Sequence, residues 1–143
     1  MRVVVQRTLS SSVKVDGNIV GKIDNGLTIL VGFGYNDTSK VIDYMVDKIV
    51  NLRIFDDENG VMNRSLLDVN GSILSISQFT LYADTSHGRR PSYISANKNA
   101  KPLYDEFNDK LKAYTKVETG IFGADMEVSL INDGPVTIVL EKE

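Results

Sequence analysis

The chain has 143 residues, of which 42% are apolar and 24% charged, and this indicates one globular domain over residues 1–143 rather than a disordered or fibrous protein. The absence of cysteine excludes disulfides, thiolate metal sites and a cysteine nucleophile, and it agrees with a cytoplasmic location. A net charge of −3 argues against holding nucleic acid mainly by neutralising phosphates, and no run of about 18 apolar residues is present to cross a membrane.

The first quarter of the chain is predicted to be an antiparallel meander. Short β-branched runs alternate with turn residues, and Asp16-Gly17 and Asn25-Gly26 are dipeptides typical of two-residue hairpins. The strands expected on this basis are residues 2–8, 12–16, 18–24 and 27–33.

Two amphipathic helices are predicted from apolar residues at helical spacing. The first follows Asp37 or Thr38, either of which can cap it, and the second lies within residues 98–114, where Pro102 is tolerated only in the first turn. The expected buried residues are Val41, Met45, Ile49 and Leu52 in the first helix and Leu103, Phe107 and Leu111 in the second, while Lys40, Asp43, Asp47 and Asn51 should face solvent.

The remaining segments are predicted to be strands. Residues 71–83 indicate one long strand whose polar residues gather towards its end, and Met126, Val128 and Leu130 alternate with polar residues as in a half-buried strand. In "LINDGPVTIV", residues 130–139, a turn is predicted between two strand-like stretches. Asp133-Gly134 favours a hairpin, yet Pro135 has no N–H to close one. Together these segments predict a mixed α/β domain of strand pairs and two helices.

His87 is the only histidine and lies among residues typical of a surface loop. A Ser-His-Asp triad would need it as the base, with Ser86, Ser77 or Thr80 as nucleophile. A single histidine in a loop is a weak signal, so a solvated side chain is the favoured interpretation. No cluster of His, Asp and Glu has the spacing of metal ligands, and no metal is expected.

"GFGYND", residues 32–37, lies between a strand and a helix, where a dinucleotide-binding loop would lie. The third glycine of that motif is replaced by Asp37, whose carboxylate would repel a pyrophosphate at the helix start. Gly32 and Gly34 are therefore interpreted as residues that form turns.

In "SQFTLYA", Ser77, Gln78 and Thr80 interrupt an apolar strand where it leaves the core, and polar residues at a strand end commonly line sites. A strand that simply runs into solvent explains the pattern equally well. Arg89 and Arg90 could bind phosphate or face water. Taken singly, none of these motifs decides a function.

Taken together, the motifs resemble those of the bacterial and eukaryotic D-aminoacyl-tRNA deacylases. The resemblance runs from Met1 to about Leu140 and rests on "SQFTLYAD" and "TGIFGADMEVSLINDGPVTI", supported by three other segments: "VVVQR", "LRIFDDENGVMNRS" and "GRRPSY". It implies hydrolysis of the ester of D-aminoacyl-tRNA and of mischarged glycyl-tRNA, in a homodimer that binds the 3′ end of the tRNA. It also implies a three-layer α/β/β fold with a barrel-like strand arrangement and two main helices.

The resemblance also implies the residues of the site. Ser77, Gln78, Phe79 and Thr80 would form the catalytic pocket, with the backbone N–H groups of Phe79 and Thr80 stabilising the oxyanion. The substrate-binding residues would be Gly134 and Pro135, joined by a cis peptide and inserted into the partner subunit's pocket, together with Arg7 and Met126. A backbone wall at the α-carbon would reject L side chains by overlap.

No base stands beside Thr80 in the sequence, so activation of water by the ribose 2′-hydroxyl, without cofactor or metal, is the preferred route. An esterase that uses Thr80 or Ser77 with His87 stays open. So does a non-catalytic dimeric module that binds free amino acids or a tRNA end. Candidates for contact with the acceptor stem are Arg89, Arg90, Lys98 and Lys101.

Overall fold

In the computed structural model, which describes residues 1–143, the chain begins with one long hairpin. β1 (Arg2–Val15) pairs antiparallel along one edge with both β2 (Asn18–Ile23) and β3 (Gly26–Gly32). The turn has positive φ at Asp16 (50°) and Gly17 (80°), as a two-residue hairpin requires, so this turn is confirmed.

The predicted meander is wrong, because Asn25-Gly26 does not reverse the chain. Strands 2–8 and 12–16 are one strand, and β2 and β3 continue in the same direction along it. Gly26 instead serves close packing, since a Cβ there would lie 1.9 Å from the carbonyl oxygen of Ser72. The Asn25-Gly26 dipeptide therefore resembles a hairpin turn only because Gly26 packs against a neighbouring strand.

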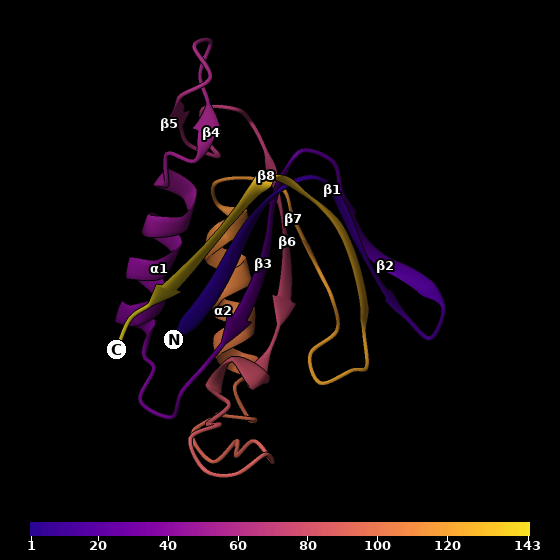
Figure 1. Cartoon of the computed structure of the whole chain (residues 1–143), viewed down its shortest axis with the longest axis vertical. Helices are drawn as coiled ribbons and strands as arrows, with labels where there is room; N and C mark the ends of the chain where they lie inside the picture. The colour runs from indigo at the N-terminus through magenta and orange to yellow at the C-terminus, as the bar shows by residue number, and fades with distance from the viewer.

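Two crossovers complete the main sheet (Figure 1). α1 (Ser39–Asn51) lies in the connection from β3 to the parallel strand β6 (Ser72–Ser77), and α2 (Lys101–Lys112) in that from β6 to the parallel β7 (Val117–Thr119). The sheet order is β2-β1-β3-β6-β7, and β8 (Glu127–Glu141) pairs with β1. A small hairpin of β4 (Phe55–Asp56) and β5 (Met62–Arg64) follows α1 and projects from one end of the molecule.

Both helices bury the faces that the sequence predicts. Val41, Met45, Ile49, Phe107 and Leu111 are buried. Leu52 and Leu103 are half-buried, and the predicted polar face of α1 is exposed. Pro102 lies in the first turn of α2, where its missing N–H costs no helical bond. Neither helix is long and apolar enough to cross a membrane.

Two cores separate three layers, which confirms the predicted α/β/β class. The larger core lies between the helices and one face of the sheet, and includes Val5, Ile29 and Phe107. The smaller core lies on the opposite face, where Val13, Ile23, Leu74 and Ile76 pack together with Met126 and Val128 against them. β2 and the first half of β8 therefore curl over the sheet and give it a barrel-like form.

β8 contains no chain reversal, which corrects the predicted turn at residues 130–139. Residues on both sides of Asp133-Gly134 pair with β1 in one direction, from Lys14↔Glu127 to Arg2↔Glu141. Between the pairs Gln6↔Thr137 and Thr8↔Asn132, residues 133–136 of β8 stand opposite Arg7 alone. These four residues form a bulge, hereafter the 133–136 bulge. Figure 1 shows β8 bending sharply near the end of the sheet where its label stands.

β6 ends at Ser77, so the predicted strand over 71–83 is too long. Its neighbours end there as well, because the last pairs are Val31↔Ser77 and Ser75↔Thr119, and Gln78 N–H makes a final bond of 2.7 Å to the Val31 carbonyl. Without a partner strand, the chain winds into a 3₁₀ helix, η1 (Phe79–Tyr82).

Neither Gly32 nor Gly34 has a positive φ, but Gly34 does begin a turn, in which the Asp37 N–H donates to the Gly34 carbonyl at 3.4 Å. A Cβ at Gly32 would lie 2.8 Å from the Gln78 carbonyl oxygen, and one at Gly34 would lie 3.2 Å from the Tyr82 ring. Both glycines therefore let the segment after β6 pack closely on the end of β3. Asp37 binds the Gly34 N–H through its carboxylate at 2.7 Å, and α1 has no side-chain cap.

Candidate active site

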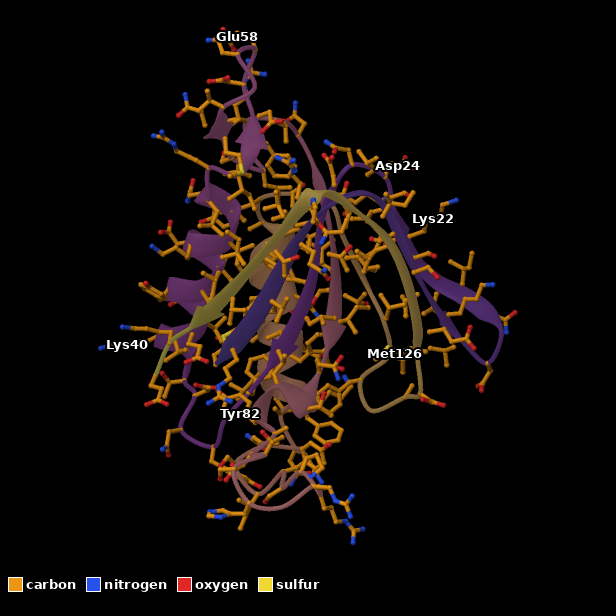
Figure 2. The ribbon with its side chains drawn as sticks, in the orientation of Figure 1. Lys22, Asp24, Lys40, Glu58, Tyr82 and Met126 are labelled. Carbon is orange, nitrogen blue, oxygen red and sulfur yellow. The ribbon has the colours of Figure 1, made fainter.

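A cavity of about 410 Å³ opens where β6 ends. One wall is the end of β6 and the start of η1, and the other is the segment that leads into β8. Of the residues predicted for the site, Ser77, Gln78, Phe79 and Met126 line this cavity. Met126, labelled in Figure 2, also packs against the smaller core, so this side of the cavity is supported by buried side chains.

The start of η1, where Phe79 lines the cavity, leaves two backbone donors without a partner. The first i→i+3 bond of η1 is donated by the Leu81 N–H to the Gln78 carbonyl at 3.3 Å. The N–H groups of Phe79 and Thr80 precede this bond and have no partner within the helix. Adjacent free N–H groups of this kind can stabilise a developing oxyanion.

The Thr80 side chain has no base beside it. Its hydroxyl oxygen accepts a 2.5 Å hydrogen bond from the Gln78 side-chain amide, and Thr80 does not line the cavity. His87 is exposed in the loop from Asp84 to Ser92, whose ends are joined by two backbone hydrogen bonds. The only titratable residues that line the cavity are Lys98 and Asp125, and no group of His, Asp and Glu is arranged to hold a metal.

Aromatic rings and one cation form the rim of the cavity. Phe79 is 43% exposed and meets Tyr93 edge to face, with ring centroids 5.3 Å apart. The Lys98 ammonium lies 5.1 Å from the Phe79 centroid and 5.8 Å from that of Tyr93. Arg89, Arg90 and Lys101, the other predicted RNA contacts, are exposed and do not line this cavity.

Arg2 fastens the far end of η1 to β1. Its guanidinium donates a 2.8 Å hydrogen bond to the Leu81 carbonyl and lies 4.4 Å from the centre of the Tyr82 ring. Burial, and next the charge of Asp37, raise the pKa of Tyr82 to about 12. The Tyr82 phenol is therefore neutral at neutral pH, and Arg2 contacts both the backbone and a side chain of η1.

Gly134 and Pro135 do not line this cavity, although both belong to the predicted site. Their peptide bond is cis, both residues are exposed, and they lie in the 133–136 bulge of β8. In Figure 1, the bend of β8 and η1 lie towards opposite ends of the sheet. Within one chain, the predicted site residues thus form two separate groups.

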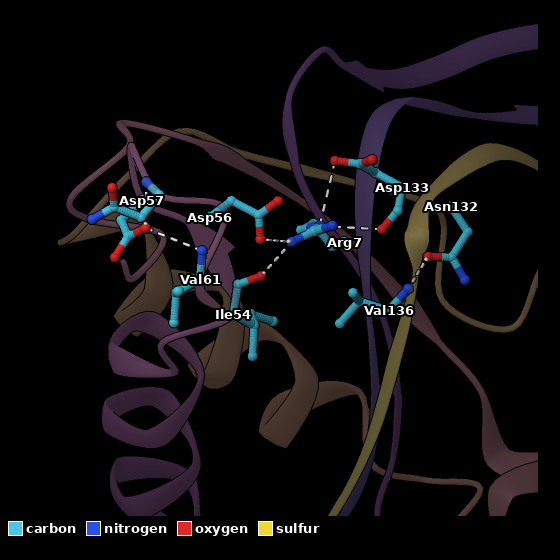
Figure 3. A network of polar contacts seen from close by, with 9 residues as sticks. Arg7, Ile54, Asp56, Asp57, Val61, Asn132, Asp133 and Val136 are labelled. Atoms are coloured by element: carbon cyan, nitrogen blue, oxygen red, sulfur yellow. Dashed lines mark hydrogen bonds and ion pairs between the residues drawn. The ribbon is translucent and has the colours of Figure 1, made fainter. Parts of the chain in front are cut away.

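Arg7 lies between the 133–136 bulge and the segment that contains Ile54 and Asp56 (Figure 3). Its Nε donates to the Asp133 carbonyl at 3.1 Å and lies 3.3 Å from the Asp133 carboxylate. One terminal nitrogen donates to the Ile54 carbonyl at 2.8 Å and lies 3.3 Å from an Asp56 carboxylate oxygen. The side chain is only 8% exposed, so the guanidinium is fixed between the bulge and the β4–β5 hairpin.

Asn132 closes the bulge from within β8. Its side-chain oxygen accepts a 3.1 Å hydrogen bond from the Val136 N–H, and its amide nitrogen donates to the Thr137 hydroxyl at 2.9 Å. Asn132 therefore provides the acceptor for the first N–H after Pro135.

The wall that leads into β8 was assigned too narrowly from the sequence. Residues 122–125 line the cavity beside Met126, although only Met126 was predicted to do so. The signal available in the sequence was the pair of turn-favouring residues Gly123 and Asp125 just before the alternating strand. In the structure Gly123 has a φ of +78°, which confirms a turn there.

Known proteins that resemble this chain match it over nearly its whole length. The family model described as D-Tyr-tRNA(Tyr) deacylase matches residues 4–141. A protein named D-aminoacyl-tRNA deacylase from Thermosipho africanus (strain TCF52B) is 56% identical, with 100% of this chain and 98% of that protein aligned. The solved structure of a c-Myc DNA unwinding element binding protein has a TM-score of 0.94 at 40% identity, covering 100% of this chain and 99% of that one. A structure described as a probable eukaryotic D-amino acid tRNA deacylase shares the fold, with a TM-score of 0.83 at 18% identity and 97% of each chain covered.

Proposed function

Because this chain belongs to the D-Tyr-tRNA(Tyr) deacylase family, we propose that it hydrolyses the ester between a D-amino acid and the terminal ribose of tRNA. The products are the free D-amino acid and tRNA, and glycine mischarged on tRNA is also a substrate. The observation that carries this proposal is the cavity at the end of β6, which has no histidine among its lining residues and lies beside the start of η1, where the N–H groups of Phe79 and Thr80 are unpaired. The enzyme acts in the cytoplasm, where its substrate is made.

The chemistry is attack of water on the ester carbonyl. The water oxygen bonds to the carbonyl carbon, the bond to the ribose 3′-oxygen breaks, and a proton from the water ends on that oxygen. The N–H groups of Phe79 and Thr80 stabilise the negative charge on the carbonyl oxygen, and loss of one such donor costs about 3 kcal/mol in comparable sites. The vicinal 2′-hydroxyl orients the water, since no histidine lines the cavity.

Selection against L-amino acids requires a second copy of the chain. The 133–136 bulge of one copy enters the cavity of the other, where Gly134 and Pro135 present backbone to the α-carbon. Support comes from the exposure of both residues and from their absence from the cavity of their own chain. Ile131 and Val139 of the same strand are 56% and 64% exposed, as an interface would explain.

The first test compares the loss of end-labelled D-tyrosyl-tRNA and L-tyrosyl-tRNA with purified protein and no added metal. Fast loss of the D form alone is expected. Loss of both forms would indicate an unselective esterase and direct attention to Thr80 and His87. Binding without loss of either form would indicate a module that only binds the tRNA end.

Sharing of the site between copies is tested by subunit complementation. Ala124→Trp fills the cavity, and Gly134→Val disrupts the bulge, so each homodimer should be inactive. In a heterodimer of the two variants, purified through two different tags, the intact bulge of the Ala124→Trp chain enters the intact cavity of the Gly134→Val chain. We expect this heterodimer to regain activity. An inactive heterodimer that is folded, or a fully active monomer in light scattering, would overturn the inserted bulge.

A further inference from the structure

We propose that the ammonium of Lys98 binds the phosphate joining the last two nucleotides of the tRNA, a contact that rests on the proposed function. Lys98 lies in the loop before α2 and lines the cavity beside Phe79. It would fix the ribose of the terminal adenosine relative to the backbone donors of η1.

The charge on Lys98 is available to a ligand. It forms no ion pair, in contrast to Lys101, which lies 2.7 Å from the Asp105 carboxylate, and Lys110, which is paired with Asp43 and Glu106. Asp125 also lines the cavity but forms no ion pair with Lys98. Lys98 is therefore the single cation of a cavity in a chain with a net charge of −3.

Two aromatic rings hold the ammonium in place. It lies 5.1 Å from the Phe79 centroid and 5.8 Å from that of Tyr93, within the range of cation–π attraction. An aromatic ring, unlike a carboxylate, does not neutralise the cation, so the ammonium still has donors for an anion.

The chemistry of the substrate selects the phosphate. The 5′-phosphate and the 3′-ester are attached to the same ribose, so the phosphate is the anion nearest the scissile bond. Phe79 supplies both a ring that holds Lys98 and a proposed oxyanion donor. One residue thus sets the spacing between the phosphate contact and the ester contact, and a lysine suits a phosphate as a point charge.

The test uses two minimal substrates, 3′-D-tyrosyl-adenosine and the same compound with a 5′-phosphate. Lys98→Gln should lower kcat/KM for the phosphorylated compound roughly five- to tenfold, mainly through KM, and leave the other compound within about twofold. Lys98→Arg should restore most of the loss because it keeps the charge. Lys48→Gln is the matched control, because the Lys48 ammonium also lies over an aromatic ring, 5.7 Å from the Tyr44 centroid, but outside the cavity, and it should behave as wild type with both compounds.

The outcomes separate this contact from the proposed function. If the wild-type protein hydrolyses neither compound nor D-tyrosyl-tRNA, the proposed function fails. If it hydrolyses them but Lys98→Gln lowers both rates equally, the lysine only supports Phe79 and the phosphate contact is wrong. With tRNA, the same variant should make the slope of log KM against log salt shallower by about 0.7, the contribution of one phosphate contact on a single strand, and an unchanged slope would contradict the contact.

Discussion

The Nε atom of Arg7 donates a 3.1 Å hydrogen bond to the carbonyl oxygen of Asp133 and so joins β1 to the bulge of β8. Another nitrogen of the same guanidinium binds the Ile54 carbonyl at 2.8 Å. A planar group with donors in fixed directions can bind both carbonyls at once, whereas an ammonium cannot reproduce that geometry. The position of Gly134 and Pro135 therefore depends on a residue distant in sequence.

Replacing Arg7 with lysine should disorder the bulge while keeping the charge. Because the buried Ile54 carbonyl and the half-buried Asp133 carbonyl would lose donors, we expect the free energy of unfolding to fall by about 2 to 3 kcal/mol in urea denaturation. Deacylation of D-tyrosyl-tRNA should fall with it. Arg64→Lys, at an exposed pair with Glu58, is the control and should change neither quantity. An Arg7→Lys protein as stable and as selective as wild type would contradict this role.

Gly134 is expected to tolerate no side chain. Its φ is +122°, and a Cβ would lie 3.0 Å from both an Arg7 nitrogen and a Val136 methyl carbon. Gly134→Ala should cost about 2 to 3 kcal/mol of stability and most of the activity. Gly17→Ala is the control, because its φ is +80° but nothing lies within 4 Å of its Cβ, and it should cost about 1 to 2 kcal/mol without affecting activity. Equal losses of activity would show that strain alone is responsible.

The Thr80 hydroxyl should be dispensable for the chemical step. Thr80→Ala removes the acceptor of the Gln78 amide bond, so we expect a fall in kcat of about tenfold at most, through a less ordered pocket. Single-turnover rates with D-tyrosyl-tRNA measure this directly. A nucleophile would instead lose about 10⁴-fold or more on the same substitution.

His87 provides the companion test. It is exposed and does not line the cavity, so His87→Ala should hydrolyse D-tyrosyl-tRNA at the wild-type rate. Loss of turnover in a folded His87→Ala protein would revive an esterase mechanism with this side chain as base.

Local patterns predicted the elements whose cause is local. The apolar faces of α1 and α2 follow from residue spacing, and the Asp16-Gly17 turn follows from two residues that accept positive φ. The sequence failed where the cause lies elsewhere in the chain. Gly26 and Gly32 are glycines because Ser72 and Gln78 approach them, and this cannot be distinguished from a turn without the fold.

The site shows the same division. The polar end of β6 is visible as Ser77, Gln78 and Thr80, but its conversion into η1 depends on where β3 and β7 end. The bulge is visible only as a hairpin dipeptide followed by proline, because its support, Arg7, is distant in sequence. The aromatic rings around Lys98 likewise come from separate segments, one of them η1. The resemblance to a family predicted that Gly134 and Pro135 belong to the site, whereas their contacts with Arg7 and Asn132 are visible only in the structure.

Tyr82 should lower the stability of the protein at alkaline pH. A phenol in the unfolded chain ionises near pH 10, whereas burial and the nearby Asp37 carboxylate raise the pKa of Tyr82 in the folded chain to about 12. Between these values the unfolded chain binds fewer protons than the folded one, so the free energy of unfolding falls as pH rises. Tyr82→Phe removes this ionisable group, so the free energy of unfolding should fall less steeply with pH, by at most the contribution of one proton. Urea denaturation at about pH 9, 10 and 11 measures the two slopes. The decline should not vanish, because burial also raises the pKa of Tyr104. Identical slopes for the variant and the wild type above pH 10 would mean that the Tyr82 phenol ionises as readily in the folded protein as in the unfolded chain.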